Sequence, residues 1–332
     1  MRGPALNRRE SAADGAIPAG AAEFADAMVR ALRDRPRSIE PKFFYDAAGM
    51  ALFERICELD EYYLTRTEIA ILQEQAQHIA RLIGPHADVV EFGAGSPAKA
   101  GIVLTALPSP SRYVPVDLSA APADGALHDL QSAFPGLRVE PLAADFVLPL
   151  ALPAPRPGDG RRVGLFLGST IGNLSAAQAR DFLAGTAASF AGGGLLVGVD
   201  LVKDPAVLHR AYNDAQGVTA AFNRNVLARA NRELGADFDP DSFDHYACYR
   251  PDERRIEMHL VSRRRQAVHV CGETFEFAEG ESLHTENSHK FTVEGFQQLA
   301  RAAGLAPGPV WCDRLCRFSV HWLAVPPRPA VR

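Results

Sequence analysis

A glycine-rich turn, Gly93-Ala94-Gly95, connects the apolar run 88–92 to a segment that begins Ser96-Pro97-Ala98-Lys99. Glycine lets a backbone pass close to a ligand where a side chain would collide, and the start of a helix offers unpaired N–H groups. Asp117 follows Gly95 by 22 positions and ends a second apolar run. A carboxylate at that place can accept both hydroxyls of a ribose. The spacing therefore predicts a site for a nucleoside-type cofactor.

The glycine turn alone does not identify the cofactor, because Gly93-x-Gly95-x-x-Ala98 also fits a loose dinucleotide fingerprint or a plain tight turn. Pro97 suits the first turn of a helix better than a turn that wraps a pyrophosphate. Asp145-Phe146 closes a third apolar run, where a carboxylate can bind an adenine amine and a ring can stack on the base. These features favour S-adenosylmethionine over NAD. The predicted cofactor-binding residues are Gly93, Gly95, Lys99, Asp117, Asp145 and Phe146.

Lys99 and the pair Asp145-Phe146 each have a plainer interpretation. Lys99 falls in the first turn of the predicted helix, where it can reach a cofactor carboxylate or can simply be solvated. Asp145 and Phe146 can be a loop carboxylate beside a core ring. Their register with the glycine turn favours the cofactor site.

A second group of polar residues lies far along the chain from the glycine turn. Glu286 and Ser288 are two positions apart, so in an extended segment both side chains point the same way. A glutamate can accept from an imidazole N–H, and a serine hydroxyl can serve the other ring nitrogen. Asn173 follows an apolar run and Gly172, and its amide is a neutral donor suited to a carboxylate. The alternatives are a polar turn at Glu286 and Ser288 and a helix-capping role for Asn173.

Alternating strands and helices must position these residues. Strands are predicted at 88–92, 112–117, 137–142, 163–168 and 194–200, and helices near 98–107, 120–133 and 175–190. Such alternation indicates a parallel sheet that binds ligands at the carboxyl ends of its strands. Before it, helices are predicted at 22–32, 51–59 and 67–83, with an irregular segment at 41–46. In the third helix, Ile69, Leu72, Ala76 and Ile79 form an apolar stripe.

The pattern changes after residue 200, which predicts an insertion in the α/β unit. Two helices are expected within 205–234 and antiparallel strands within 246–277, before a helix at 292–303 and strands at 308–312 and 317–324. The predicted division is a disordered tail (1–20), a substrate-binding domain (21–66 plus 203–290) and a domain that binds S-adenosylmethionine (67–202 plus 291–332).

Composition argues against several classes of partner. The 332-residue chain has a formal charge of −5, which argues against nucleic acid, and it has no apolar run long enough to span a bilayer. Its five cysteines form no CxxC pair, which indicates reduced thiols in a cytoplasm. His284 and His289 show no metal-ligand spacing, so no metal is expected. We expect a cytoplasmic monomer that acts on a small molecule.

Eight blocks of sequence resemble the histidine Nα-methyltransferases of ergothioneine biosynthesis, from about residue 40 to the C-terminus. They are Phe44-Tyr45-Asp46, 61–68, 166–174, 200–204, 210–214, 220–225, Arg255-Ile256-Glu257-Met258 and 285–291. The resemblance implies an α/β class I methyltransferase (Rossmann-like) doubly wound sheet with an inserted α+β substrate-binding domain. It also implies trimethylation of the α-amine of L-histidine to hercynine.

The resemblance implies a role for each substrate residue. Asn173 and Tyr212 would hold the substrate carboxylate, and Tyr45 would lie near the amine as proton acceptor or orienter. Glu286 and Ser288 would bind the imidazole, with Tyr62 and Met258 beside it. Each tyrosine is equally consistent with a half-buried packing residue.

The chain departs from the family pattern at three places. Leu64 replaces a usual proline after the tyrosine pair, the glycine turn differs in sequence, and Asn287 replaces a small apolar residue. Asn287 should point away from the imidazole. Three other functions stay open: methylation of another amino acid or an indole derivative such as tryptophan, a binding module without catalysis, and an NAD-dependent oxidoreductase.

Overall fold

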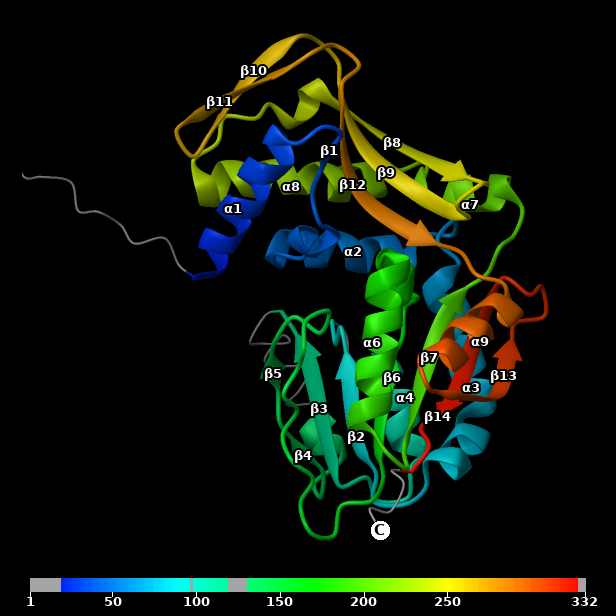
Figure 1. Cartoon of the computed structure of the whole chain (residues 1–332). Coiled ribbons are helices and arrows are strands. Elements are labelled where there is room, and N and C mark those ends of the chain that lie inside the picture. Colours follow the sequence, from blue (N-terminus) through cyan, green and yellow to red (C-terminus); the bar gives the residue numbers. More distant parts are fainter. Residues whose placement is uncertain (1–18, 96–97, 119–129, 328–332) are drawn as a thin grey trace, which may run out of the picture.

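An eight-stranded sheet fills the lower part of the molecule in Figure 1, within the described residues 19–95, 98–118 and 130–327 of this computed structural model. The strand order is β13-β14-β7-β6-β2-β3-β4, and β5 also pairs with β3. The strands are β2 (Asp88–Phe92), β3 (Arg112–Asp117), β4 (Arg138–Val139), β5 (Leu142–Ala143), β6 (Arg162–Phe166), β7 (Gly194–Asp200), β13 (Ala306–Cys312) and β14 (Phe318–Ala324).

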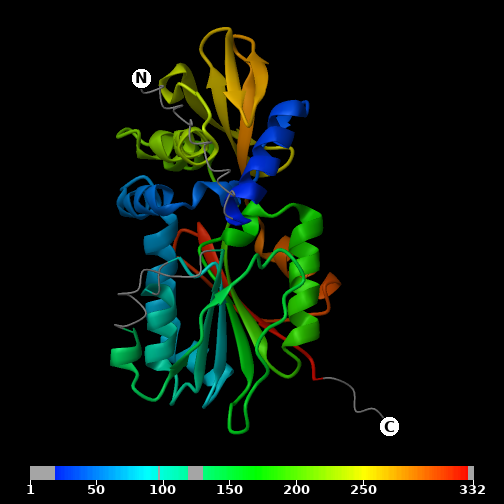
Figure 2. The same cartoon turned by 90° about the vertical axis from the view of Figure 1, so that its left-hand side faces the viewer.

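Helices cover both faces of this sheet (Figure 2). On one face lie α3 (Leu64–Ile83) and α4 (Ala98–Ala106), and on the other lie α6 (Ala176–Ser189) and α9 (Val293–Ala302). Every residue of β2 and β7 is buried, as expected for strands covered on both faces. β2, β3, β6 and β7 pair in parallel, whereas β14 enters antiparallel to β7. The predicted doubly wound α/β sheet is confirmed.

A second sheet lies above the carboxyl ends of the parallel strands, with the order β1-β12-β9-β8 (Figure 1). Its strands are β1 (Arg37–Ser38), β8 (Phe243–Arg250), β9 (Arg255–Ser262) and β12 (Ser282–His289), and β10 (Gln266–Val270) and β11 (Glu273–Phe277) form a separate hairpin. The helices here are α1 (Ala19–Arg33), α2 (Ala47–Glu58), α7 (Pro205–Tyr212) and α8 (Val218–Leu234). The two helices predicted within 205–234 are confirmed.

A β-bulge interrupts the pairing of β12 with β9 between His284 and Glu286. The extra residue is Thr285, whose fully buried hydroxyl donates to Asn223 Oδ1 at 2.8 Å or to the Met258 carbonyl at 3.0 Å. Beyond the bulge, Glu286 pairs with Met258 and Ser288 pairs with Ile256. The bulge therefore sets which face of the sheet the residues after it occupy.

Several predicted boundaries were wrong for local reasons. The single strand predicted at 137–142 is two short strands, β4 and β5, separated by Glu140-Pro141, and proline has no N–H for a continuous ladder. The segment 41–46 contains a 3₁₀ helix, Pro41–Phe44, instead of being irregular throughout. The helix predicted at 51–59 begins at Ala47, because the Asp46 carboxylate caps it by accepting from Gly49 N at 2.8 Å.

Other predictions fall partly or wholly outside the described residues. Most of the helix predicted at 120–133 lies outside the described residues, and the described residues 130–133 are helical. Pro97 and residues 1–18 of the predicted tail also lie outside. Ala19 and Gly20, which were predicted to belong to the tail, are instead part of α1.

Candidate active site

The glycine turn follows β2 at the carboxyl edge of the large sheet. Gly93 and Gly95 are exposed, and Gly93 has a φ of 73°, a conformation that favours glycine. A Cβ on Gly95 would lie 3.1 Å from Cε of Met50 in α2, and one on Gly93 would lie 3.6 Å from the Phe146 ring. Gly95 therefore lets α2 lie close to the turn, and Gly93 lies beside the Phe146 ring.

The ends of β3 and β5 bring the two predicted carboxylates to the same edge. Ala143 pairs with Asp117, and Ala144 N donates to the Asp117 carbonyl at 2.8 Å. Asp145 is the next residue, so it lies at the same edge of the sheet as Asp117. The Phe146 ring packs edge-on against Phe166 at 5.5 Å. Asp145 also accepts a hydrogen bond from Lys42 Nζ at 3.0 Å, an ion pair that the sequence did not suggest. A ligand that bonds Asp145 must share the carboxylate with Lys42.

Lys99 is held by a buried acid that sequence reasoning missed. Its Nζ lies 2.6 Å from Glu68 Oε2, and the Glu68 carboxylate also accepts from Gly168 N at 2.8 Å. Glu68 is fully buried in α3. A Cβ on Gly198 would lie only 1.8 Å from Glu68 Oε1, so β7 makes room for this carboxylate. Glu68 thus fixes Lys99 near the end of β6.

Glu91 is a second buried acid near the cofactor site, two residues before Gly93. Burial raises its pKa to about 7, although the hydrogen bond donated by the Tyr113 hydroxyl and the charge of Lys99 lower it. The sequence signal for Glu91 was a charged residue inside an otherwise apolar stretch, whereas Glu68 follows Arg66 and Thr67 and had no such signal.

Glu286 and Ser288 point to the same buried face of β12, as predicted. Glu286 is 7% exposed and Ser288 is 4% exposed, whereas Asn287 between them points to the other face and accepts from His284 at 3.1 Å. The Glu286 carboxylate makes no hydrogen bond or ion pair with any residue that the structure describes. Met258, its cross-strand partner, is buried beside it. Burial raises the pKa of Glu286 to about 7 against the opposing charge of Lys290.

Tyr212 and Ser288 belong to a buried network around Lys290 and Asp200. The Tyr212 and Ser288 hydroxyls are 2.8 Å apart, and Lys290 Nζ lies 2.9 Å from the first and 2.8 Å from the second. Lys290 also forms an ion pair with Asp200 at 2.8 Å, and Tyr63 donates to the same carboxylate at 2.9 Å. Tyr212 and Ser288 were predicted site residues, whereas Lys290, which joins them, was not.

The three predicted tyrosines belong to one cluster of aromatic rings. Tyr62 packs edge-on against Tyr212 at 6.4 Å, and Tyr45 packs edge-on against Phe53 at 5.7 Å and Phe222 at 5.6 Å. Burial, and next to it the charge of Glu286, raises the pKa of Tyr45 well above its ordinary value. Tyr45 is therefore a neutral phenol at physiological pH. Phe53 and Phe222 add aromatic walls that the sequence analysis did not single out.

Asn173 ends a short 3₁₀ helix, Thr170–Asn173, which packs against the end of β12. A Cβ on Gly172 would lie 2.8 Å from the His289 carbonyl, so this contact needs a glycine. Asn173 is half-buried, and its amide bonds to no side chain or backbone group in the described ranges. The helix cap that was the alternative role is taken by Ser175, which accepts from Gln178 N. The 3₁₀ helix thus brings Asn173 near the end of β12, the strand that carries Glu286 and Ser288.

One cluster outside this site has residue types that bind metals. Cys248, Glu257 and His259 place ligand atoms within 4.8 Å of one another on the other face of the upper sheet. Glu257 already accepts from Arg255 at 2.6 Å. His284, which was predicted not to be a ligand, has both ring nitrogens bonded, to Ser38 at 2.9 Å and to Asn287.

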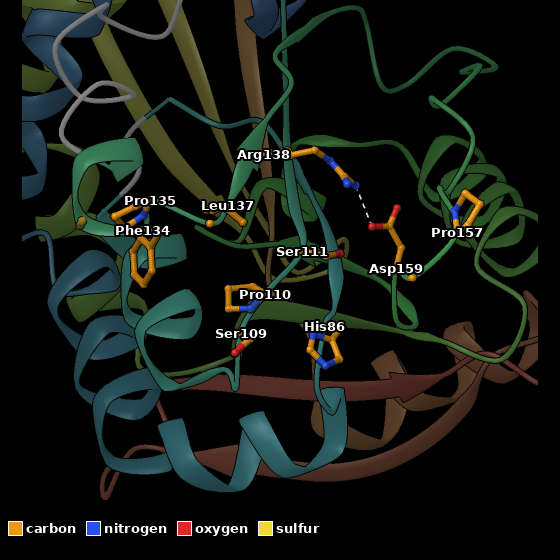
Figure 3. Close-up of a pocket in the computed structure, with 13 residues that line it drawn as sticks. His86, Ser109, Pro110, Ser111, Phe134, Pro135, Leu137, Arg138, Pro157 and Asp159 are labelled. Atoms are coloured by element: carbon orange, nitrogen blue, oxygen red, sulfur yellow. Dashed lines mark hydrogen bonds and ion pairs between the residues drawn. The ribbon is translucent and has the colours of Figure 1, made fainter.

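A cavity of about 520 Å³ lies at the opposite, amino-terminal edge of the large sheet (Figure 3). Its lining includes His86, Pro110 and an Arg138–Asp159 ion pair of 2.7 Å. None of the predicted site residues lines it. Among the described helices, none has the length and apolarity that crossing a membrane requires.

The large sheet is doubly wound and has one antiparallel strand. A glycine turn follows its first strand, and acidic residues stand at the ends of the next two. This combination defines a class I, S-adenosylmethionine-dependent methyltransferase. The chain belongs to the histidine-specific, SAM-dependent methyltransferase family, whose model matches residues 24–325. This confirms both the predicted fold class and the resemblance.

Three of the related proteins show the extent of this similarity. The chain is 44% identical to the histidine N-alpha-methyltransferase of Mycolicibacterium smegmatis, over 88% of this chain and 92% of that one. It is 42% identical to the protein of the same name from Mycobacterium tuberculosis, with the same coverage. It is 30% identical to ergothioneine biosynthesis protein 1 of Neurospora crassa, over 84% of this chain and 32% of that one.

Proposed function

We propose that this protein transfers three methyl groups from S-adenosylmethionine to the α-amine of L-histidine, giving hercynine for ergothioneine biosynthesis. The observation that carries the proposal is the unpartnered carboxylate of Glu286, buried beside Ser288 and Met258. Burying a carboxylate without a partner is costly, so the fold retains it for a ligand that offers N–H groups. Imidazole offers one such group when neutral and two when charged. The names of the mycobacterial relatives point to the same substrate.

The proposed division of labour follows the two parts of the fold. Residues 21–66 and 203–290 would form the substrate-binding domain, and 67–202 and 291–332 the domain that binds S-adenosylmethionine. Gly93, Gly95 and Asp117 would hold the nucleoside with Asp145 and Phe146. Lys99 would hold the methionine carboxylate. Asn173 and Tyr212 would bind the histidine carboxylate.

The donor supplies a methyl group on a sulfonium, so its transfer moves positive charge from sulfur to nitrogen and creates little new charge. The work of the protein is then positioning and exclusion of water. Tyr45 is neutral at physiological pH, which favours a role in orienting the amine over one as a strong base. Aromatic walls from Phe53 and Phe222 would favour the growing ammonium by cation–π contact, worth about 0.5–2 kcal/mol. No metal is needed for this chemistry.

Holding the substrate at both ends explains how one site makes three transfers. With the carboxylate fixed at Asn173 and Tyr212 and the ring fixed at Glu286 and Ser288, the nitrogen can turn between transfers. The indole of tryptophan is large and apolar and has a single ring N–H, so it suits the pair Glu286 and Ser288 less well than a two-nitrogen imidazole does, which argues against tryptophan as substrate. We also propose that the protein is a monomer and that it is cytoplasmic. Its five cysteines are free thiols, which supports the second of these proposals.

The test is to incubate the protein with S-adenosylmethionine and each amino acid in turn and to follow mass. We expect a gain of three methyl groups on histidine alone. Glu286→Ala should raise the histidine KM strongly while S-adenosylmethionine binding persists. Unchanged histidine kinetics in this variant would contradict the imidazole assignment, and trimethylation of another amino acid would contradict the substrate.

A further inference from the structure

Lys290 is a fully buried cation that donates to two hydroxyls at the proposed substrate site. Its Nζ lies 2.8 Å from Asp200 Oδ2, 2.9 Å from Tyr212 Oη and 2.8 Å from Ser288 Oγ. An ammonium has three N–H donors and no acceptor, so these three partners use all of its donors. Tyr212 and Ser288 therefore both accept from Lys290.

The two hydroxyls have only two protons to give, and their own contact uses one. Tyr212 Oη and Ser288 Oγ are 2.8 Å apart, a distance at which one hydroxyl donates to the other. Lys290 holds the two hydroxyl oxygens close together. They would repel each other unless a proton of one hydroxyl lay between them. One proton is left that can be donated to a ligand.

The chemistry of the ligand decides which hydroxyl gives that proton. A carboxylate has no proton and needs a donor. Resting on the proposed function, in which Tyr212 meets the histidine carboxylate, we propose that Lys290 is a positioning residue that fixes the direction of these hydrogen bonds. Ser288 donates to Tyr212, Tyr212 donates to the carboxylate, and Ser288 can only accept from the imidazole.

This direction sets the protonation of the bound ring. If Ser288 accepts one ring N–H, the other ring nitrogen and Glu286 must share a proton. The pair is either glutamate with imidazolium or glutamic acid with neutral imidazole, and both hold the same number of protons. An imidazole titrates near about 6.5 in solution, and burial raises the pKa of Glu286 to about 7. At pH 8.5 neither group is protonated before binding, so binding takes up one proton from the buffer.

Other titratable groups face Glu286 and the bound ring. With one exception, they do not contribute to the proton uptake on binding. Burial keeps Tyr45, Tyr62 and Tyr212 neutral by raising their pKa. Burial lowers the pKa of Lys290, but Asp200 and Tyr212 together raise it further and keep Lys290 charged. Lys203 is the exception, because burial lowers its pKa to about 8. It lies 2.7 Å from Asp200 Oδ1 and has no bond to Tyr212 or Ser288. Lys203→Met is therefore the matched control.

The experiment is calorimetry of hercynine binding at pH 8.5, with S-adenosylhomocysteine present, in buffers of different ionisation enthalpy. The trimethylammonium of hercynine cannot titrate, so the dependence on buffer counts only protons taken up at the ring and the protein. We expect close to one proton for the wild type and for Lys203→Met. Lys290→Met should lose most of the uptake, because Ser288 is then free to donate to the ring. Ser288→Ala should lose it too while keeping Lys290.

The outcomes separate this inference from the proposed function. Hercynine binding with no proton uptake in the wild type would overturn the inference alone. Full uptake in Lys290→Met would overturn the role of Lys290. If S-adenosylhomocysteine bound and hercynine did not, the proposed function would fall and the inference with it.

Discussion

At the scale of single residues, the site concentrates buried polar groups whose charge is set by their surroundings. Lys290 and Asp200 are both fully enclosed and compensate each other at 2.8 Å. Glu286 is enclosed without such a partner, and its pKa moves towards neutral. A carboxylate of this kind binds a ring N–H well because it is already desolvated. That desolvation lowers the free energy of unfolding of the protein.

We predict that Glu286→Gln stabilises the folded protein at alkaline pH and has little effect at acid pH. Burial raises the pKa of Glu286 from 4.5 to about 7. Below the lower value both states are protonated and ionisation costs nothing. Above the upper value the folded state must hold a buried carboxylate, at a cost of roughly 3 kcal/mol at most. The penalty therefore appears as pH rises between the two values.

The measurement is the melting temperature of the ligand-free protein across this pH range. The difference between Glu286→Gln and the wild type should grow as the pH rises and then level off. Glu279→Gln, at an exposed position, is the control and should give a flat difference. A flat difference for Glu286→Gln as well would contradict the prediction.

At the scale of secondary structure, short irregularities determine which face of the sheet the side chains of the site residues occupy. The bulge at Thr285 puts Glu286 and Ser288 on the face that carries Met258. The same bulge lets His284 and Asn287, three positions apart, meet on the other face. Sequence alternation predicted that 286 and 288 share a face, but it could not show which face, because an inserted residue changes that without changing the pattern.

Other features of the site depend on contacts between elements far apart in sequence. In the apolar stripe predicted for the helix at 67–83, Leu72 and Ile79 are buried as predicted, whereas Ile69 and Ala76 are half-buried. Glu68 and Ile71 are buried instead. A periodicity rule assigns a charged residue to the solvent side, whereas here Lys99 and Gly168 on other elements compensate the buried charge. The strands, the glycine turn and the shared face of Glu286 and Ser288 were predictable because each has a local or motif signal. The ion pairs that hold them were not.

We predict that Gly198→Ala weakens S-adenosylmethionine binding at least about tenfold, equivalent to roughly 1.4 kcal/mol. The new Cβ would lie 1.8 Å from Glu68 Oε1 in a fully buried position, so Glu68 must leave Lys99 and Gly168. Lys99 would then lose the partner that fixes it at the proposed cofactor site. Calorimetry with S-adenosylhomocysteine measures the change.

The matched control is Gly101→Ala in α4. A Cβ there meets nothing within 4 Å, so the substitution should leave cofactor binding unchanged and stabilise the helix by about 0.5–1 kcal/mol. Wild-type affinity in Gly198→Ala would refute the role assigned to Glu68.

At the scale of the whole molecule, one apolar core joins the two sheets. A single cluster of buried side chains includes Phe243 and Leu260 from the upper sheet and Val89 and Leu196 from the lower one. The Lys42–Asp145 ion pair crosses the same junction at 3.0 Å. The proposed site residues come from both parts of the molecule, so a ligand bound by them would contact both.

We predict that the protein unfolds in one cooperative transition and that S-adenosylhomocysteine stabilises both sheets together. At 100 times its Kd, a ligand that binds only the folded state adds about 2.7 kcal/mol to the free energy of unfolding. Because the core is shared, that gain should slow hydrogen exchange in β9 as well as in β2, although only β2 adjoins the glycine turn. Calorimetric melting combined with hydrogen exchange measures both effects. Two separate transitions, or slowing confined to β2, would mean that the lobes unfold independently and that binding at the cofactor site does not prepare the substrate site.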